Sequence, residues 1–180
     1  MRLQASVSDL WETIADEAAA ESGLWAQALL PDGERELEPV FSPLGEPRFA
    51  LGLETIYEGY LLHYGRPRLF TRSDRDNALL LGDYLYAHGL VRIASFQEVG
   101  AVADLAELIS LCAQLRAEDG GSDGPVWAAS AALLGQGRLR EARDALRLGG
   151  DPGPLAGLAV EAAGADSVDD ALSAHHLRVG

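Results

Sequence analysis

The sequence contains no lysine, only one cysteine (Cys112), and no apolar run long enough to cross a membrane. A single cysteine excludes an internal disulfide and any zinc site built from several cysteines. A membrane-spanning helix needs about 20 predominantly apolar residues in a row, so we expect no membrane span. The first ten residues carry no apolar signal core, and we therefore expect a cytoplasmic protein.

All 14 basic residues are arginines, and 28 acidic residues oppose them, which gives a formal net charge of −14. Nucleic acids attract basic surfaces, so this balance argues against nucleic-acid binding. The acidic excess is uneven along the chain. Residues 1–60 hold 12 acids and 3 bases, a balance of −9, whereas residues 61–118 hold 7 acids and 6 bases, a balance of −1. The middle of the chain is therefore its near-neutral part.

Apolar residues recur at helical spacing through most of the chain, and no stretch alternates as a β-strand would. Glycine, proline and capping residues mark where the helices end. We predict an all-α helical bundle that forms a single domain over residues 1–180. The expected helices are a first one that ends at Gly23 and further ones at about residues 49–62, 73–95, 98–117, 125–134, 139–148, 154–163 and 167–177.

Two segments stand out from this helical pattern. Residues 78–87, at the centre of the helix expected at 73–95, are apolar nearly all the way round, which is typical of a helix buried among others. Gly82, Ala87 and Gly89 on that helix would let neighbouring helices approach closely. Four of the eight prolines lie between Pro31 and Pro47, which indicates a long loop and a candidate lid.

One stretch of the chain resembles a known enzyme family. The segment Asn77–Ala87 carries a Gly-Asp-aromatic-Leu core, and Gly65–Pro67 precedes it as a Gly-x-Pro element. In this order and spacing, the two elements are similar to those of polyprenyl diphosphate synthases. The similarity covers about residues 53–118. It implies a helical bundle like a truncated isoprenoid synthase fold, with residues 48–118 as the prenyl-synthase-like core and residues 119–180 as shorter C-terminal helices.

The resemblance also implies where a metal would bind. The family holds magnesium through two aspartate-rich motifs, because this hard cation prefers oxygen ligands. The first motif should occupy residues 54–58, where Glu54 and Glu58 share a helix face. These two glutamates are the weak candidate magnesium ligands, and the alternative is a solvated helix face. The second motif has no convincing counterpart, since the only adjacent aspartate pair, Asp169–Asp170, lies near the C-terminus.

The family's diphosphate-binding residues are displaced here. Two arginines normally precede the glycine of the Gly-x-Pro element, but this sequence has His63 and Tyr64 there. The resemblance implies that the nearby Arg66 and Arg68, together with Asp83, form a vestigial diphosphate site. The alternative for the arginines is pairing with nearby acids. The alternative for Asp83 is a buried carboxylate, which would need a partner because an unpaired buried charge is costly.

These departures favour a non-catalytic relative of the polyprenyl synthases. It would act as an accessory subunit or a prenyl-chain-binding helical protein, packing through the helices of residues 49–117 against a catalytic synthase subunit or a second copy of itself. One alternative is a magnesium-dependent short prenyltransferase that uses Glu54 and Glu58 on isoprenoid diphosphates. Another is a helical interaction module without a ligand, since residues 133–152 resemble a single tetratricopeptide hairpin.

Overall fold

The computed structural model describes residues 7–118 and 122–179, and their fold is all-α as predicted. Within these residues the only β-structure is an isolated bridge between Leu29 and Phe70. No described helix is long and apolar enough to cross a membrane. The elements in chain order are α1 (Val7–Glu21), α2 (Gly23–Ala28), η1 (Asp32–Glu34), η2 (Ser42–Leu44), η3 (Pro47–Phe49), α3 (Ala50–Tyr64), α4 (Arg75–Ala94), α5 (Val99–Ala117), α6 (Gly124–Ala132), α7 (Arg140–Gly149), α8 (Gly153–Ala163) and α9 (Ala165–Val179).

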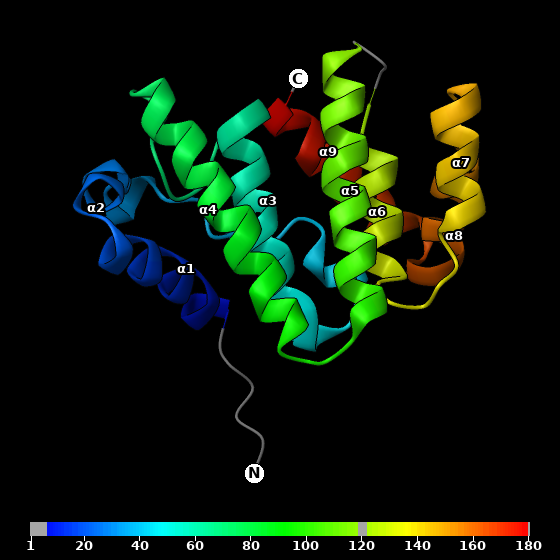
Figure 1. Cartoon of the computed structure of the whole chain (residues 1–180), viewed down its shortest axis with the longest axis horizontal. Helices are drawn as coiled ribbons and strands as arrows, with labels where there is room; N and C mark the ends of the chain where they lie inside the picture. Colours follow the sequence, from blue (N-terminus) through cyan, green and yellow to red (C-terminus); the bar gives the residue numbers. More distant parts are fainter. Residues whose placement is uncertain (1–6, 119–121, 180) are drawn as a thin grey trace.

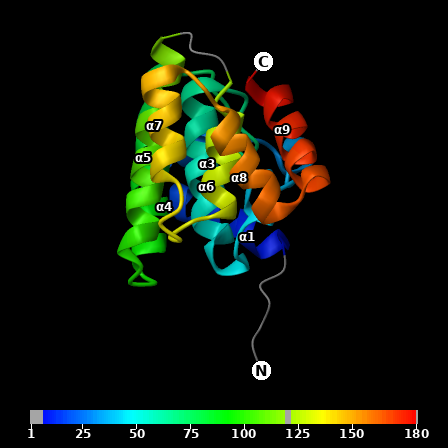
Figure 2. The same cartoon turned by 90° about the vertical axis from the view of Figure 1, so that its right-hand side faces the viewer.

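The helices pack in layers around α3. In Figure 1, α4 and α5 lie side by side at the front, and α3 lies behind them in contact with α4. Figure 2 shows the bundle from the side, with α5 and α7 along one edge, α9 at the opposite edge, and α3, α6 and α8 between them. The helices α1 and α2 cover the flank of α3 and α4. This arrangement makes α3 the centre of the core.

The structure identifies α3, and not α4, as the helix that is buried on all sides. Every residue of α3 from Gly52 to Leu62 is buried. By contrast, α4 buries one face through residues such as Leu81 and Leu85, while Leu80 on its opposite face is 62% exposed. The expectation that α4 would be buried all round is therefore wrong. Apolar composition shows that a helix can be buried. It does not show which helix the other helices surround in the fold.

Paired glycines bring α3 and α4 into close contact in an antiparallel register. A Cβ atom added to Gly59 would lie 2.8 Å from the carbonyl oxygen of Gly82, and one added to Gly89 would lie 3.0 Å from that of Gly52. These positions leave almost no room for a side chain, so the two helix backbones can meet only where glycine stands. The predicted role of Gly82 and Gly89 is thus confirmed, whereas Ala87 is exposed.

The proline-rich segment before α3 is joined to the core by backbone hydrogen bonds. The amide of Leu30 donates to the carbonyl of Leu69 at 2.8 Å, and that of Glu36 donates to the carbonyl of Arg68 at 3.2 Å. Farther along, Phe41 is 1% exposed. The segment therefore forms part of the wall around α3, and its backbone lies directly beside the loop that follows α3.

Candidate functional site

The candidate metal ligands Glu54 and Glu58 lie one helical turn apart on α3, and both contact the guanidinium of Arg68. Arg68 donates from Nη1 to Oε2 of Glu54 at 2.5 Å and from Nε to Oε2 of Glu58 at 2.9 Å. All three side chains are at most 1% exposed. Burial lowers the pKa of the Arg68 guanidinium, but the two carboxylates outweigh that effect and raise it overall. Arg68 therefore stays charged in the core.

Backbone amides engage the remaining carboxylate oxygens. Oε1 of Glu54 accepts hydrogen bonds from the amides of Val40 and Ser42, at 3.2 and 3.1 Å. Oε1 of Glu58 accepts from both amides of residues 68–69, at 2.8 Å each. Buried charges need such partners, because their hydration is lost. The network ties the segments before and after α3 to the helix itself.

This arrangement does not fit a magnesium site. Magnesium needs oxygen ligands that it can reach and usually keeps several waters, whereas both carboxylates are buried and every oxygen of Glu54 and Glu58 already accepts a hydrogen bond. The positive guanidinium of Arg68 would also repel a cation there. The alternative of a solvated helix face is wrong as well, because both glutamates are buried. In the part of the chain that the structure describes, no three His, Cys, Asp or Glu side chains are grouped to hold a metal.

Arg66 and Arg68, which the sequence placed in one diphosphate site, lie in different environments. Arg68 is fully buried, so its guanidinium cannot reach a ligand at the surface. The Arg66 side chain is 59% exposed and pairs with Glu36. The same carboxylate of Glu36 accepts a hydrogen bond from Nη2 of Arg178 at 3.0 Å. Only Arg66 of the two predicted arginines is therefore available to a ligand.

Arg66 lines an open cleft of about 360 Å³ together with Arg72. Arg72 donates to the carbonyl oxygens of Gly65 and His63 at the C-terminus of α3, at 2.6 and 3.2 Å. A cation at this end of a helix interacts favourably with the helix dipole. Leu30, Pro67 and Phe70 form an apolar part of the lining, and Glu34 and Glu36 add two carboxylates. The cleft thus combines two guanidinium groups with two carboxylates and an apolar wall.

Asp83 lies apart from the two arginines, on the exposed face of α4. Its side chain is 71% exposed, and its Oδ1 lies 3.1 Å from Nε2 of His63. Burial lowers the pKa of His63, and Asp83 counteracts part of that shift. The expectation that Asp83 would be a buried carboxylate is wrong, because α4 leaves this face open. No contact in the described residues joins Asp83 to Arg66 or Arg68.

A second buried polar network joins α3, α5, α6 and α9, and sequence reasoning missed it. Asp123 accepts hydrogen bonds from the hydroxyl of Tyr60 at 2.6 Å and from Nη2 of Arg116 at 3.0 Å. The ring of His175 bridges this carboxylate to Tyr57, with contacts of 3.0 and 2.9 Å. No local pattern could reveal the pairing, since His175 lies 52 residues after Asp123.

This second network has a structural role. The side chains of Asp123 and His175 are at most 2% exposed, so a substrate cannot reach them. Burial raises the pKa of both Tyr57 and Tyr60, which keeps the phenols protonated as hydrogen-bond donors. Burial alone would also raise the pKa of Asp123, but hydrogen bonds from His175, Tyr60 and Arg116 outweigh it and lower the pKa. The network therefore holds an ionised carboxylate where four helices meet.

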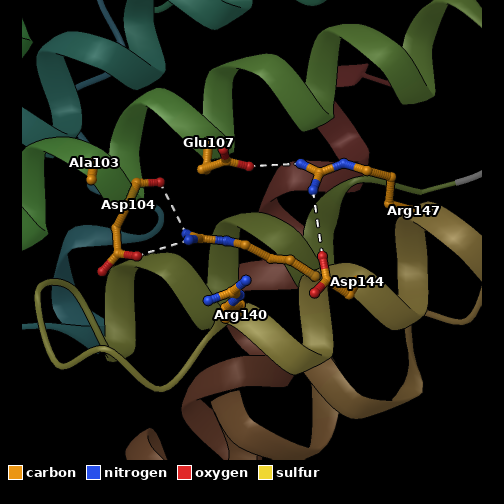
Figure 3. Close-up of a pocket in the computed structure, with 7 residues that line it drawn as sticks. Ala103, Asp104, Glu107, Arg140, Asp144 and Arg147 are labelled. Carbon is orange, nitrogen blue, oxygen red and sulfur yellow. Dashed lines mark hydrogen bonds and ion pairs between the residues drawn. The ribbon is translucent and has the colours of Figure 1, made fainter.

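A third group of charged residues lines a cleft of about 380 Å³ between α5 and α7 (Figure 3). Arg143 of α7 is buried and donates to Oδ1 of Asp104 at 2.7 Å and to Oγ of Ser130 at 3.2 Å. Arg147 donates to Glu107 at 2.6 Å near the rim. The residues that line the cleft are Ala103, Asp104, Glu107, Arg140, Arg143, Asp144 and Arg147.

The three arginines of this cleft share one face of α7, because they stand at positions i, i+3 and i+7 of the helix.

Comparison with known proteins adds no assignment for this cleft or for the other two networks. No protein-family model matches the chain, no curated protein matches it, and no solved structure matches it. The relationship to polyprenyl diphosphate synthases is therefore a hypothesis that depends on the motifs of residues 53–118.

Proposed function

We propose that this is a non-catalytic helical protein that acts by associating with a second copy of itself. The observation that carries the non-catalytic part is that every carboxylate oxygen of Glu54 and Glu58 is buried and accepts a hydrogen bond from Arg68 or from a backbone amide. Without free carboxylates at these positions, the described residues offer no group of ligands for the metal that ionises an allylic diphosphate in the similar family. An accessory role, which the resemblance implies, needs no such site.

The proposed contact surface is the outer face of α4 together with the start of α5, termed here the α4–α5 face. It is defined by Leu80, Ala87 and Val91 on α4 and by Val99 on α5. Leu80, Ala87 and Val91 lie on one stripe of the helix, since they are seven and four residues apart. The side chains of Val91 and Val99 are 66% and 81% exposed. Exposed apolar side chains that share a face mark protein contacts in many soluble proteins.

Charge favours a second copy as the occupant of this face. The whole chain carries −14, but residues 61–118, which include all of α4 and α5, carry only −1. Two copies of an acidic chain repel least where each is close to neutral. A two-fold axis through the α4–α5 face would bury the apolar stripe of one copy against that of the other.

Sedimentation equilibrium of the full chain tests this proposal. We expect a dimer for the wild type and a monomer for Leu80→Glu and Val91→Glu, because each variant places a charge in the contact. The matched control is Leu148→Glu, since Leu148 is 86% exposed at the end of α7, away from this face. It should leave the dimer intact. A wild type that stays monomeric at about 100 μM, well above typical dissociation constants of stable dimers, would overturn the proposal.

A second candidate function is binding of an isoprenoid diphosphate in the cleft of Arg66 and Arg72. The observation that favours it is the pairing of two guanidinium groups with an apolar wall, where Arg72 has no carboxylate partner among the described residues. Glu36 already neutralises Arg66 and would compete with the diphosphate. Titration with farnesyl diphosphate should therefore give weaker binding for Arg66→Gln and tighter binding for Glu36→Gln. Binding that neither substitution changes would exclude this cleft.

A further inference from the structure

The cleft between α5 and α7 contains one arginine that is not neutralised. Arg140 lines the cleft, and it makes no hydrogen bond or ion pair with any residue that the structure describes. In Figure 3 its guanidinium lies between Asp104 and Asp144 without a dashed contact to either. The other two arginines of the cleft, Arg143 and Arg147, each hold a carboxylate of α5. Arg140 is therefore free to bind a group from solution.

Two further features add positive potential beside Arg140. It is the first residue of the ten-residue helix α7, and the preceding Leu139 provides no side-chain cap for the helix N-terminus. Uncapped backbone N–H groups leave a partial positive charge at that end, which Glu141 in the first turn offsets only in part. In addition, Nε of the buried Arg143 has no hydrogen-bond partner. Three arginines and three carboxylates line the cleft, but donors of Arg140 and Arg143 remain unpaired among the described residues.

We propose that the α5–α7 cleft binds a small phosphate-bearing molecule, with Arg140 as its main ligand and Arg147 at the rim. An apolar ligand does not fit, because Ala103 is the only apolar residue of the lining. A monocarboxylate would bring Arg140 a single charge and two acceptor oxygens. A phosphate near pH 7 has a charge between −1.5 and −2 and three acceptor oxygens, and the planar arginine fork matches it bidentately.

The exposed residues of the cleft permit a test with variants that keep the fold. Arg147 is shared between Glu107 at 2.6 Å and Asp144 at 3.6 Å, and these three side chains are 35% to 50% exposed. Ion pairs this exposed contribute little to stability, so a phosphate can replace them at low cost. Removing the negative charge of Asp144 should therefore strengthen phosphate binding, while removing the positive charge of Arg140 should weaken it.

The experiment is a calorimetric titration of the full chain with inorganic phosphate and, separately, with glycerol 3-phosphate. We expect Arg140→Gln to weaken binding at least about tenfold, the effect of losing a charge-assisted hydrogen bond, and Asp144→Asn to strengthen it. The control is Arg138→Gln, because Arg138 pairs with Glu161 outside the cleft; it should change the affinity less than about twofold. Tighter binding of glycerol 3-phosphate would identify an organic phosphate as the ligand class, and equal binding would identify phosphate itself.

Two results would overturn the proposal. The first is the absence of saturable binding of either probe at millimolar concentrations. The second is an equal loss of affinity in Arg140→Gln and Arg138→Gln, which would show a general charge effect and not a site. Neither result depends on self-association through the α4–α5 face, which is tested by a different measurement on different residues.

Discussion

Nε of Arg68 lies 2.9 Å from Oε2 of Glu58, and neither side chain is exposed to solvent. This ion pair joins the loop after α3 to the middle of that helix. Glu54, one turn before Glu58, forms a second ion pair with Arg68. Burying three charged groups is costly unless each finds its partners. The glutamates that the sequence marked as candidate metal ligands therefore serve to hold an arginine, and through it two loops, against α3.

Replacing Arg68 by Met should destabilise the protein strongly. The substitution keeps most of the side-chain volume but leaves two buried carboxylates without their cation, a loss of about 3–5 kcal/mol in the free energy of unfolding. Urea unfolding followed by circular dichroism measures it. Arg66→Met is the matched control, and it should cost less than about 1 kcal/mol, because the Arg66 side chain is 59% exposed. Similar losses in the two variants would contradict a structural role specific to Arg68.

Alanine at Gly59 should weaken the packing of α3 against α4. Its Cβ would lie 2.8 Å from the carbonyl oxygen of Gly82, so one helix must shift, and we expect a loss of about 1–3 kcal/mol. Gly157 on α8 offers the comparison, since nothing lies within 4 Å of a Cβ placed there. Gly157→Ala should stabilise the protein by about 0.5–1 kcal/mol, because alanine favours helix. Thermal unfolding of both variants checks the opposite signs.

The stability contributed by Asp123 should disappear in acid. Its pKa is lower in the folded protein than the ordinary value, so the unfolded chain takes up a proton first as the pH falls. The contribution is present above the unfolded pKa of about 3.9 and is lost as the pH falls through the folded pKa. The difference in free energy of unfolding between wild type and Asp123→Asn should therefore shrink between about pH 5 and pH 3. A difference that stays constant over this range would contradict the network.

Much of the helical architecture could be predicted because its signals are local. The helices α3 and α8 end at Tyr64 and Ala163, within two residues of the expected ends at 62 and 163. The helix α5 begins and ends within one residue of the expected 98–117. Close packing at Gly82 and Gly89 could also be predicted, because a helix with glycines seven residues apart presents a bare stripe.

The candidate sites could not be predicted, because their partners are distant in the sequence. Glu54 and Glu58 at helical spacing are compatible with a metal, with solvent or with a cation, and only the fold brings Arg68 between them. The pairing of Asp123 with His175 joins two helices with no sequence pattern in common. Helical periodicity shows which residues share a face but not which other element covers that face.

The most direct test of whether Glu54 and Glu58 are structural is a calorimetric titration of the full chain with farnesyl diphosphate, with and without magnesium. We expect magnesium to leave the affinity unchanged, because every oxygen of both carboxylates is already hydrogen-bonded. Metal-independent binding would be consistent with the cleft of Arg66 and Arg72. Binding that requires magnesium would contradict the non-catalytic function proposed for this protein.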